Sequence, residues 1–192
     1  LLADEAEGRP LVLLCADVAL RGGPLVERAQ ESLARAARVE VAWLTARESR
    51  KTLRACETAW SAWASAGAGR DALVVALGGG IVSDVAGLAA ACWHRGVPWV
   101  IAPTTTLAMA DAALGGKVAV NTRAGKNLVG AIHHPRAVLA DLDALDTLPR
   151  AAFVEGLAEA VKAAVVGDAD LLDVIERSAR ALRDGDAAAA AP

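Results

Sequence analysis

The sequence predicts an α/β fold in which a parallel sheet is covered by helices on both faces. Residues 72–77 form an unbroken apolar run, which is typical of a strand buried on both faces. Strand-like and helix-like segments alternate around this run, and that alternation favours a parallel sheet. Beyond residue 149 the pattern becomes continuously helical. We therefore expect an α/β domain over residues 1–149 and the start of a helical domain over residues 150–192.

The part of the chain before the central run supplies two strands and two helices. Residues 11–15 (LVLLC) are apolar, and residues 39–44 (VEVAWL) alternate in a way that predicts a strand. Pro24 fits the first turn of a helix. A second helix is predicted around Leu53, because apolar residues recur at i, i+3, i+7 and i+10 from that position.

After the central run, three glycines lead directly into a predicted helix. The further strands are expected at residues 98–102 and 138–142, and the further helices at residues 81–93, 106–114, 151–166 and 168–182. Two glycine-flanked segments, residues 115–121 and 125–130, are expected to be loops. Each of them presents one lysine, Lys117 or Lys126.

Composition excludes several classes of protein. The net charge of −3 argues against a general nucleic-acid binder. No apolar run reaches the roughly 18 residues that cross a bilayer, so no membrane span is expected. The three cysteines, Cys15, Cys56 and Cys92, lie in apolar segments without a CxxC pair. We interpret them as buried free thiols of a cytoplasmic protein.

The glycine run at residues 78–80 is the strongest local signal for a ligand. A tight turn is the simplest use of such a run. Here it lies between a buried strand and the first turn of a helix, where free N–H groups can bind phosphate. This position favours a nucleotide or phosphate site, although the GxGxxG pattern of the common dinucleotide fingerprint is absent.

Two other groups of side chains could take part in chemistry. Lys117 and Lys126 lie beside glycines and could reach an anionic ligand, or they could be solvated loop lysines. Glu159 and Lys162 share one helix face, where a surface ion pair competes with a metal ligand or charge partner. The three histidines of the chain do not supply a complete metal site by their spacing.

Taken together, the motifs resemble 3-dehydroquinate synthase and its relatives, the sugar phosphate cyclases. The resemblance covers about residues 11–176. It rests on ALGGGIVSDVAG, RGVPWVIAPTTTLAMAD, GGKVAVN, GKNLVGA, DLDALDTLP and EGLAEAVK, in that order. The resemblance implies a Rossmann-like NAD-binding domain followed by the first helices of an all-α metal-binding domain.

The resemblance also implies roles for particular residues. Cofactor contacts are assigned to Glu48, Lys51, Gly79, Gly80, Asp84, Thr104, Thr105, Lys117, Lys126 and Thr147. Among these, Glu48 and Lys51 would hold the adenosine side of NAD. Catalytic or substrate-facing roles are assigned to Lys117, Lys162, Asp111 and Asn127. Glu159 would be one of three ligands of a divalent metal, zinc or cobalt.

The reaction implied by the resemblance is the cyclisation of a phosphorylated sugar acid, 3-deoxy-arabino-heptulosonate 7-phosphate, with elimination of phosphate. It belongs to the shikimate pathway of aromatic amino acid biosynthesis. Alternatives are a cyclase of secondary metabolism of the amino-dehydroquinate, valiolone or deoxy-inosose type, an NAD-dependent glycerol or alcohol dehydrogenase, and a non-catalytic remnant. Departures from the dehydroquinate pattern at Ser83, residues 112–114 and 118–120, and His133-His134 favour the first alternative, whereas the retained GGK favours the dehydroquinate branch.

We expect the sequence to be a piece of a longer protein. It does not begin with Met, and residues 187–192 end it without a core-like element. The resemblance places two metal-binding histidines beyond the last residue. We therefore expect the 192-residue chain to bind NAD weakly and not to turn over, and the full-length protein to be a homodimer.

Overall fold

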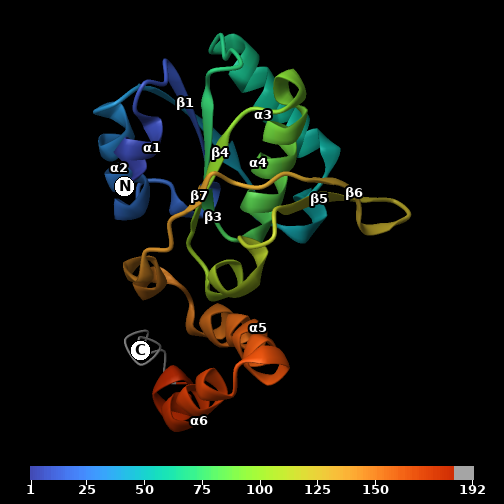
Figure 1. Cartoon of the computed structure of the whole chain (residues 1–192). Helices are drawn as coiled ribbons and strands as arrows, with labels where there is room; N and C mark the ends of the chain where they lie inside the picture. Colours follow the sequence, from blue (N-terminus) through green and yellow to red (C-terminus); the bar gives the residue numbers. More distant parts are fainter. Residues whose placement is uncertain (184–192) are drawn as a thin grey trace.

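The computed structural model describes residues 1–183, and its centre is a five-stranded parallel sheet (Figure 1). The strands are β1 (Leu11–Asp17), β2 (Arg38–Leu44), β3 (Leu73–Gly78), β4 (Trp99–Pro103) and β7 (Ala137–Val138). Their order is β2-β1-β3-β4-β7, and every pair is parallel. The apolar run β3 is buried along its whole length at the centre of the sheet, as the sequence predicted.

Helices cover both faces of the sheet, so the predicted fold class is confirmed. On one face lie α1 (Leu2–Ala6) and α2 (Pro24–Ala34), whose inner residues pack against alternate residues of β1 and β3. On the other face lie α3 (Leu53–Ser65) and α4 (Gly80–Cys92), which pack against the intervening residues. Successive side chains of a strand point to opposite faces, so one apolar run serves both cores.

The predicted loops at residues 115–121 and 125–130 are wrong, because these segments form a β-hairpin. Strand β5 (Lys117–Thr122) pairs antiparallel with β6 (Gly125–Ile132), and the register shifts between Val120 and Thr122. Val118 and Val120 are buried, and Val118 lies against α4 at Gly87. The flanking glycines suggested loops, but this apolar alternation docks the segment as a hairpin that projects from the α/β body (Figure 1).

Two smaller expectations are also wrong. The strand predicted at residues 138–142 is only the short β7, because a 3-10 helix (Leu142–Thr147) follows it closely. Cys15 and Cys56 are buried free thiols, but Cys92 is exposed because α4 ends there. The helix predicted at residues 106–114 contains a π-helical turn at Ala108–Ala112.

The helical end of the described chain consists of α5 (Arg150–Gly167) and α6 (Ala169–Arg183), below the sheet in Figure 1. It shares a small apolar cluster around Leu145, Phe153 and Leu182. Helix α5 approaches the π-helical turn at Gly156, where an added Cβ would lie 2.3 Å from the backbone N of Leu107. The division at residue 149 stays a prediction, and residues 184–192 of the expected second domain lie outside the described residues.

No helix within residues 1–183 is long and apolar enough to cross a membrane. The amphipathic helices instead turn their apolar faces to the sheet: α3 buries Cys56, Ala59 and Trp63, and α2 buries Val26, Ala29 and Leu33. In α3 the predicted spacing is confirmed at Cys56 and Trp63, whereas Leu53 is 45% exposed and Trp60 is only partly buried.

The contact between α4 and the hairpin gives a test of the fold. An added Cβ at Gly87 would lie 2.4 Å from Cγ1 of Val118 and 2.5 Å from Cη2 of Trp99. We expect Gly87→Ala to lower the free energy of unfolding by about 1–3 kcal/mol through overpacking. Urea unfolding of the two proteins measures the difference.

The matched control is Gly167→Ala in α5, where an added Cβ meets no atom within 4 Å. This control gains only helix propensity, so its stability should be unchanged or slightly raised. Equal stability of Gly87→Ala and the unmodified chain would contradict the described packing of the hairpin on α4.

Candidate active site

The glycine turn between β3 and α4 forms a backbone floor at the carboxyl edge of the sheet. Gly79 is the N-cap of α4, and an added Cβ there would lie 3.0 Å from Cγ2 of Thr105. At Gly80 an added Cβ would lie 3.1 Å from Cβ of Ala112. Side chains at these two positions would crowd the segment that follows β4. The glycines therefore leave the first turn of α4, with its free N–H groups, open to a ligand.

A cavity of about 790 Å³ lies above this floor. It contains eight of the predicted cofactor residues: Glu48, Lys51, Gly79, Gly80, Asp84, Thr104, Thr105 and Thr147. They come from four separate parts of the chain, which the parallel sheet brings to one edge. The far wall is supplied by α5, through Ala152, Glu155 and Gly156. The volume is within the usual range of cofactor clefts, which is about 300–1,000 Å³.

A second cavity, of about 640 Å³, adjoins the first. Among its lining residues are Asp111, Lys117 and Asn127, which were predicted to face the substrate. Asp84 and Ala112 line both cavities. The carboxylate of Asp84 therefore lies at the junction of the two spaces.

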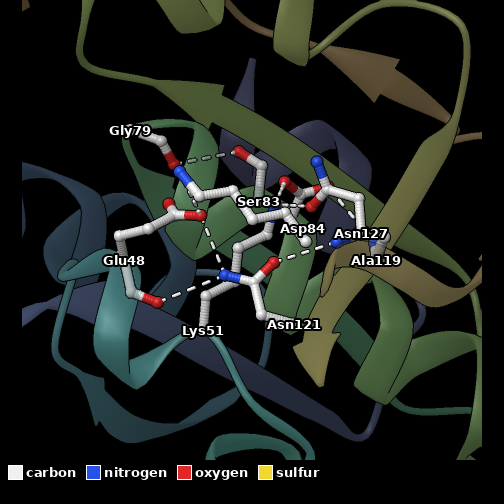
Figure 2. A network of polar contacts seen from close by, with 9 residues as sticks. Glu48, Lys51, Gly79, Ser83, Asp84, Ala119, Asn121 and Asn127 are labelled. Atoms are coloured by element: carbon white, nitrogen blue, oxygen red, sulfur yellow. Dashed lines mark hydrogen bonds and ion pairs between the residues drawn. The ribbon is translucent and has the colours of Figure 1, made fainter. Parts of the chain in front are cut away.

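A buried lysine connects the two cavities. Nζ of Lys51 lies 2.5 Å from Oδ2 of Asp84 and donates a hydrogen bond of 2.6 Å to Oδ1 of Asn127 (Figure 2). Lys51 is only 5% exposed. Its ammonium group thus faces the junction of the cavities and is paired with Asp84. The predicted role of Lys51 toward adenosine stays a prediction.

Burial changes the ionisation of Asp84. Desolvation raises the pKa of this carboxyl above its usual value, and the neighbouring Lys51 ammonium opposes that shift. The backbone N–H of Ala119 also donates to Oδ1, at 3.3 Å. Asp84 is therefore a partly buried carboxyl whose ionised form is favoured by Lys51 and by the N–H of Ala119.

Asn121 is a site residue that the sequence reasoning missed. Its Nδ2 donates to Oε1 of Glu48 at 2.8 Å, and its Oδ1 accepts the backbone N–H of Asn127 at 2.9 Å. Asn127 has a φ of 56°, a left-handed conformation that Asn adopts more readily than most residues. The hydrogen bond from Asn121 also lowers the pKa of Glu48. The only sequence signal was a polar residue between the alternating valines and the turn.

The chain has four lysines and sixteen arginines, and all four lysines lie at or beside this site. Lys126 is exposed on the hairpin, with Nζ 3.4 Å from Oε1 of Glu48, and it does not line either of the two cavities. Lys162 on α5 pairs with Glu159 one turn away and lies 3.5 Å from Oδ1 of Asp111. The hydrogen bond with Glu159 raises the pKa of Lys162.

Glu159 does not lie in a cluster of ligating groups. Within residues 1–183 there is no group of three or more His, Cys, Asp and Glu side chains that could hold a metal ion. Two of the histidines have other contacts, because Nε2 of His94 lies 3.2 Å from the carbonyl O of Ala68 and Nε2 of His133 lies 3.0 Å from that of Val97. The described part of the chain does not form a metal site by itself.

The parallel sheet is covered by helices on both faces and has a glycine floor at its carboxyl edge, beside a lysine-bearing cavity. These features define a protein of the Rossmann-like α/β class. A family model described as 3-dehydroquinate synthase N-terminal matches residues 41–155. The chain belongs to the 3-dehydroquinate synthase family.

Relatives agree with this assignment. The chain is 53% identical over 148 residues to the 3-dehydroquinate synthase of Xanthomonas axonopodis pv. citri. The aligned stretch covers 77% of this chain and 40% of that protein. It is 51% identical over 137 residues to the 3-dehydroquinate synthase of Mycobacterium leprae. That alignment covers 71% of this chain and 38% of the relative. The chain therefore spans about 40% of the length of these curated relatives.

Solved structures of sugar phosphate cyclases have the same fold. A 2-epi-5-epi-valiolone synthase from Streptomyces hygroscopicus, with NAD+ and Zn2+ bound, aligns with a TM-score of 0.83 at 33% identity over 97% of this chain and 53% of that one. A 2-deoxy-scyllo-inosose synthase complexed with carbaglucose-6-phosphate, NAD+ and Co2+ aligns with a TM-score of 0.77 at 34% identity. That alignment covers 83% of this chain and 43% of the synthase. A probable glycerol dehydrogenase from Sinorhizobium meliloti aligns with a TM-score of 0.71 over 99% of this chain and 59% of that one. At 18% identity, this likeness shows the fold alone.

The buried pair of Lys51 and Asp84 gives a test of the site's electrostatics. We expect Lys51→Met to lower the free energy of unfolding at pH 7 by about 3 kcal/mol, because it leaves a partly buried carboxylate without its partner. Without Lys51 the pKa of Asp84 in the folded state rises further above its value in the unfolded chain. A carboxyl with a raised folded pKa costs stability only when it is ionised, so the deficit should shrink as the pH falls through that pKa.

Urea unfolding between pH 4 and 8 measures this dependence. The control is the double variant Lys51→Met with Asp84→Asn, whose deficit should not change with pH because the titrating group is gone. If the loss of unfolding free energy in Lys51→Met stayed constant between pH 4 and 8, Asp84 would not be the group whose charge Lys51 compensates.

Proposed function

We propose that the chain is the NAD-binding part of a 3-dehydroquinate synthase, a carbon–oxygen lyase that cyclises a phosphorylated sugar acid. The observation that supports this most directly is the junction at Asp84. On one side lies a glycine-floored cleft with eight predicted cofactor residues, and on the other lies a cavity with Lys117 and Asn127. A nucleotide and an anionic substrate could therefore lie next to each other.

The residues of the first cavity fit NAD. Gly79 and Gly80 leave no side chain between the first turn of α4 and the cavity, which suits a pyrophosphate at a helix N-terminus. Thr104, Thr105 and Thr147 supply hydroxyl groups to the lining of the same cavity. The solved valiolone and deoxy-inosose synthases bind NAD+, which supports the same cofactor here. The chemistry that NAD would supply is hydride transfer from and back to a substrate hydroxyl carbon.

The second cavity suits a phosphorylated sugar acid. The ammonium of Lys117 would bind its phosphate or carboxylate as a point charge. Lys162 keeps its proton, since Glu159 raises its pKa, and beside Asp111 it would donate hydrogen bonds to anionic oxygens of the substrate. Asn127, held by Lys51 and Asn121, would orient the substrate at the junction.

A divalent metal does not fit the described residues alone, because Glu159 has no second and third ligand within residues 1–183. The solved relatives hold Zn2+ or Co2+, so Glu159 is proposed as one ligand of a site that needs further donors. The homodimer also stays a proposal.

The dehydroquinate branch is favoured over the secondary-metabolic cyclases. Identity is about 50% to proteins named 3-dehydroquinate synthase and about 33% to the valiolone and deoxy-inosose synthases. The departure at Ser83 does not face the substrate cavity, because this buried side chain bonds back to the carbonyl of Gly79. The departures at residues 112 and 118–119 do line that cavity.

The nucleotide proposal is tested by NAD+ titration of the 192-residue chain, followed by amide NMR shifts. We expect weak binding with shifts at Gly79, Gly80 and Thr105. Gly79→Val should weaken binding at least tenfold, because its side chain would displace Thr105 from the cleft wall. Gly167→Ala is the control and should bind as the unmodified chain does. Shifts elsewhere only, or none, would refute the assignment of the cleft.

The substrate proposal is tested with 3-deoxy-arabino-heptulosonate 7-phosphate in the presence of NAD+. We expect Lys117→Gln to weaken binding about tenfold, the value of one lost charge-assisted hydrogen bond. The control is Arg35→Gln at the C-cap of α2, an exposed position where the same charge is removed away from both cavities. Shifts at Asp111 and Ala131 report on the cavity. Equal affinity of the two variants would exclude Lys117 as an anion ligand.

A further inference from the structure

A third cavity, of about 460 Å³, lies beside the nucleotide cleft at the carboxyl end of β2. Three arginines and three threonines are among its lining residues: Arg47, Arg50, Arg54, Thr45, Thr52 and Thr58. The segment between β2 and α3 separates it from the nucleotide cleft. Ala46, Glu48 and Lys51 of that segment line the cleft, whereas its arginines line the third cavity.

The charge of this cavity is positive and uncompensated by the described residues. No Asp or Glu is among its lining residues. Within residues 1–183, the guanidinium groups of Arg47, Arg50 and Arg54 take part in none of the hydrogen bonds or ion pairs. Other arginines, such as Arg28 and Arg136, do pair with carboxylates. The nearest acid in sequence, Glu48, is turned to Asn121 and Lys126.

The gathering of three unpaired arginines stands against the balance of the whole chain, whose net charge is −3. Like charges held close together repel one another unless an anion lies between them. Guanidinium groups are also the side chains whose planar, forked donors best match a phosphate. The charge pattern of the cavity therefore points to an anionic ligand with several oxygens.

The backbone beside the arginines adds to the same preference. The cavity lies at the first two turns of α3, which has 13 residues, and its N-cap Thr52 makes no side-chain capping hydrogen bond. A helix N-terminus favours anions. The hydroxyl groups of Thr45 and Thr52 are further donors within the lining.

We propose that this cavity binds a phosphate monoester. Two sources share this chemistry. One is the 2′-phosphate of a dinucleotide in the adjoining cleft, since an arginine near the ribose accommodates that group in folds that bind NADP. The other is a separate phosphorylated metabolite. The proposal goes beyond the proposed function: the first source rests on a dinucleotide in that cleft, whereas the second is independent of it.

The test uses the 192-residue chain with inorganic phosphate as the probe, at constant ionic strength maintained with chloride. Amide shifts at Thr45, Thr52 and Thr58 report on this cavity, and shifts at Asp111 report on the proposed substrate cavity. We expect phosphate to shift all three threonines. Arg50→Gln and Arg54→Gln should each weaken that response about tenfold, and the double variant should abolish it.

Two controls separate this site from general electrostatics and from the substrate cavity. Arg35→Gln removes the same charge elsewhere and should keep the full response. Lys117→Gln should lose shifts only around Asp111. All four substituted side chains are exposed, and circular dichroism checks that each variant is folded. A double arginine variant with an unchanged phosphate response, or a wild-type chain with no response at these threonines, would overturn the proposal.

Titrations with NADP+ and NAD+ distinguish the two sources. If the group is a cofactor 2′-phosphate, NADP+ binds about tenfold tighter than NAD+, and Arg50→Gln removes the difference. If it belongs to a separate metabolite, the two dinucleotides bind equally while the phosphate response stays arginine-dependent. Failure of both dinucleotides to bind would count against the proposed function only, because the phosphate response is measured without them.

Discussion

The ammonium group of Lys51 lies where three distant parts of the chain meet. Lys51 itself lies in the segment that follows β2. Its ammonium group pairs with Asp84 on α4 and donates a hydrogen bond to Asn127 on the hairpin. A buried ammonium without such partners would be strongly unfavourable. The position of the hairpin against the α/β body is therefore linked to the compensation of this charge. The same contacts form the boundary between the glycine-floored cleft and the lysine-bearing cavity.

The arrangement explains why glycines and small residues recur around the site. Gly79 and Gly80 open the first turn of α4, Gly87 lets α4 approach Val118 of the hairpin, and Gly156 lets α5 approach the turn at Leu107. At each place a Cβ would meet a neighbouring element at 3.1 Å or less. These close approaches bring α5 to the cleft wall and the hairpin to the helix. The walls of the site are therefore elements in direct contact with one another, and a larger side chain at any of these glycines would force them apart.

Sequence reasoning predicted the sheet and the cleft, and it failed at the hairpin. The cleft was predictable because a parallel sheet places the ends of β3 and β4 at one edge, where Gly80 and Thr104 must meet. The hairpin was not, because glycines at residues 115, 116 and 125 resemble loop punctuation, whereas the pairing of β5 with β6 depends on a docking surface on α4. Asn121 escaped notice because a single polar residue in such a segment carries no local signal of its bonds to Glu48 and Asn127.

What the sequence determined by itself was the class of fold, the family and the residue types of the cleft, since apolar periodicity and glycine placement act locally along the chain. What only the tertiary structure decided was the pairing of charges. Lys51 lies against Asp84 and Asn127, Lys162 of α5 approaches Asp111, and three arginines gather without a carboxylate among the cavity's lining residues. Such pairings depend on distances between residues far apart in sequence and on the burial that strengthens or removes each charge, and neither quantity is written in local pattern.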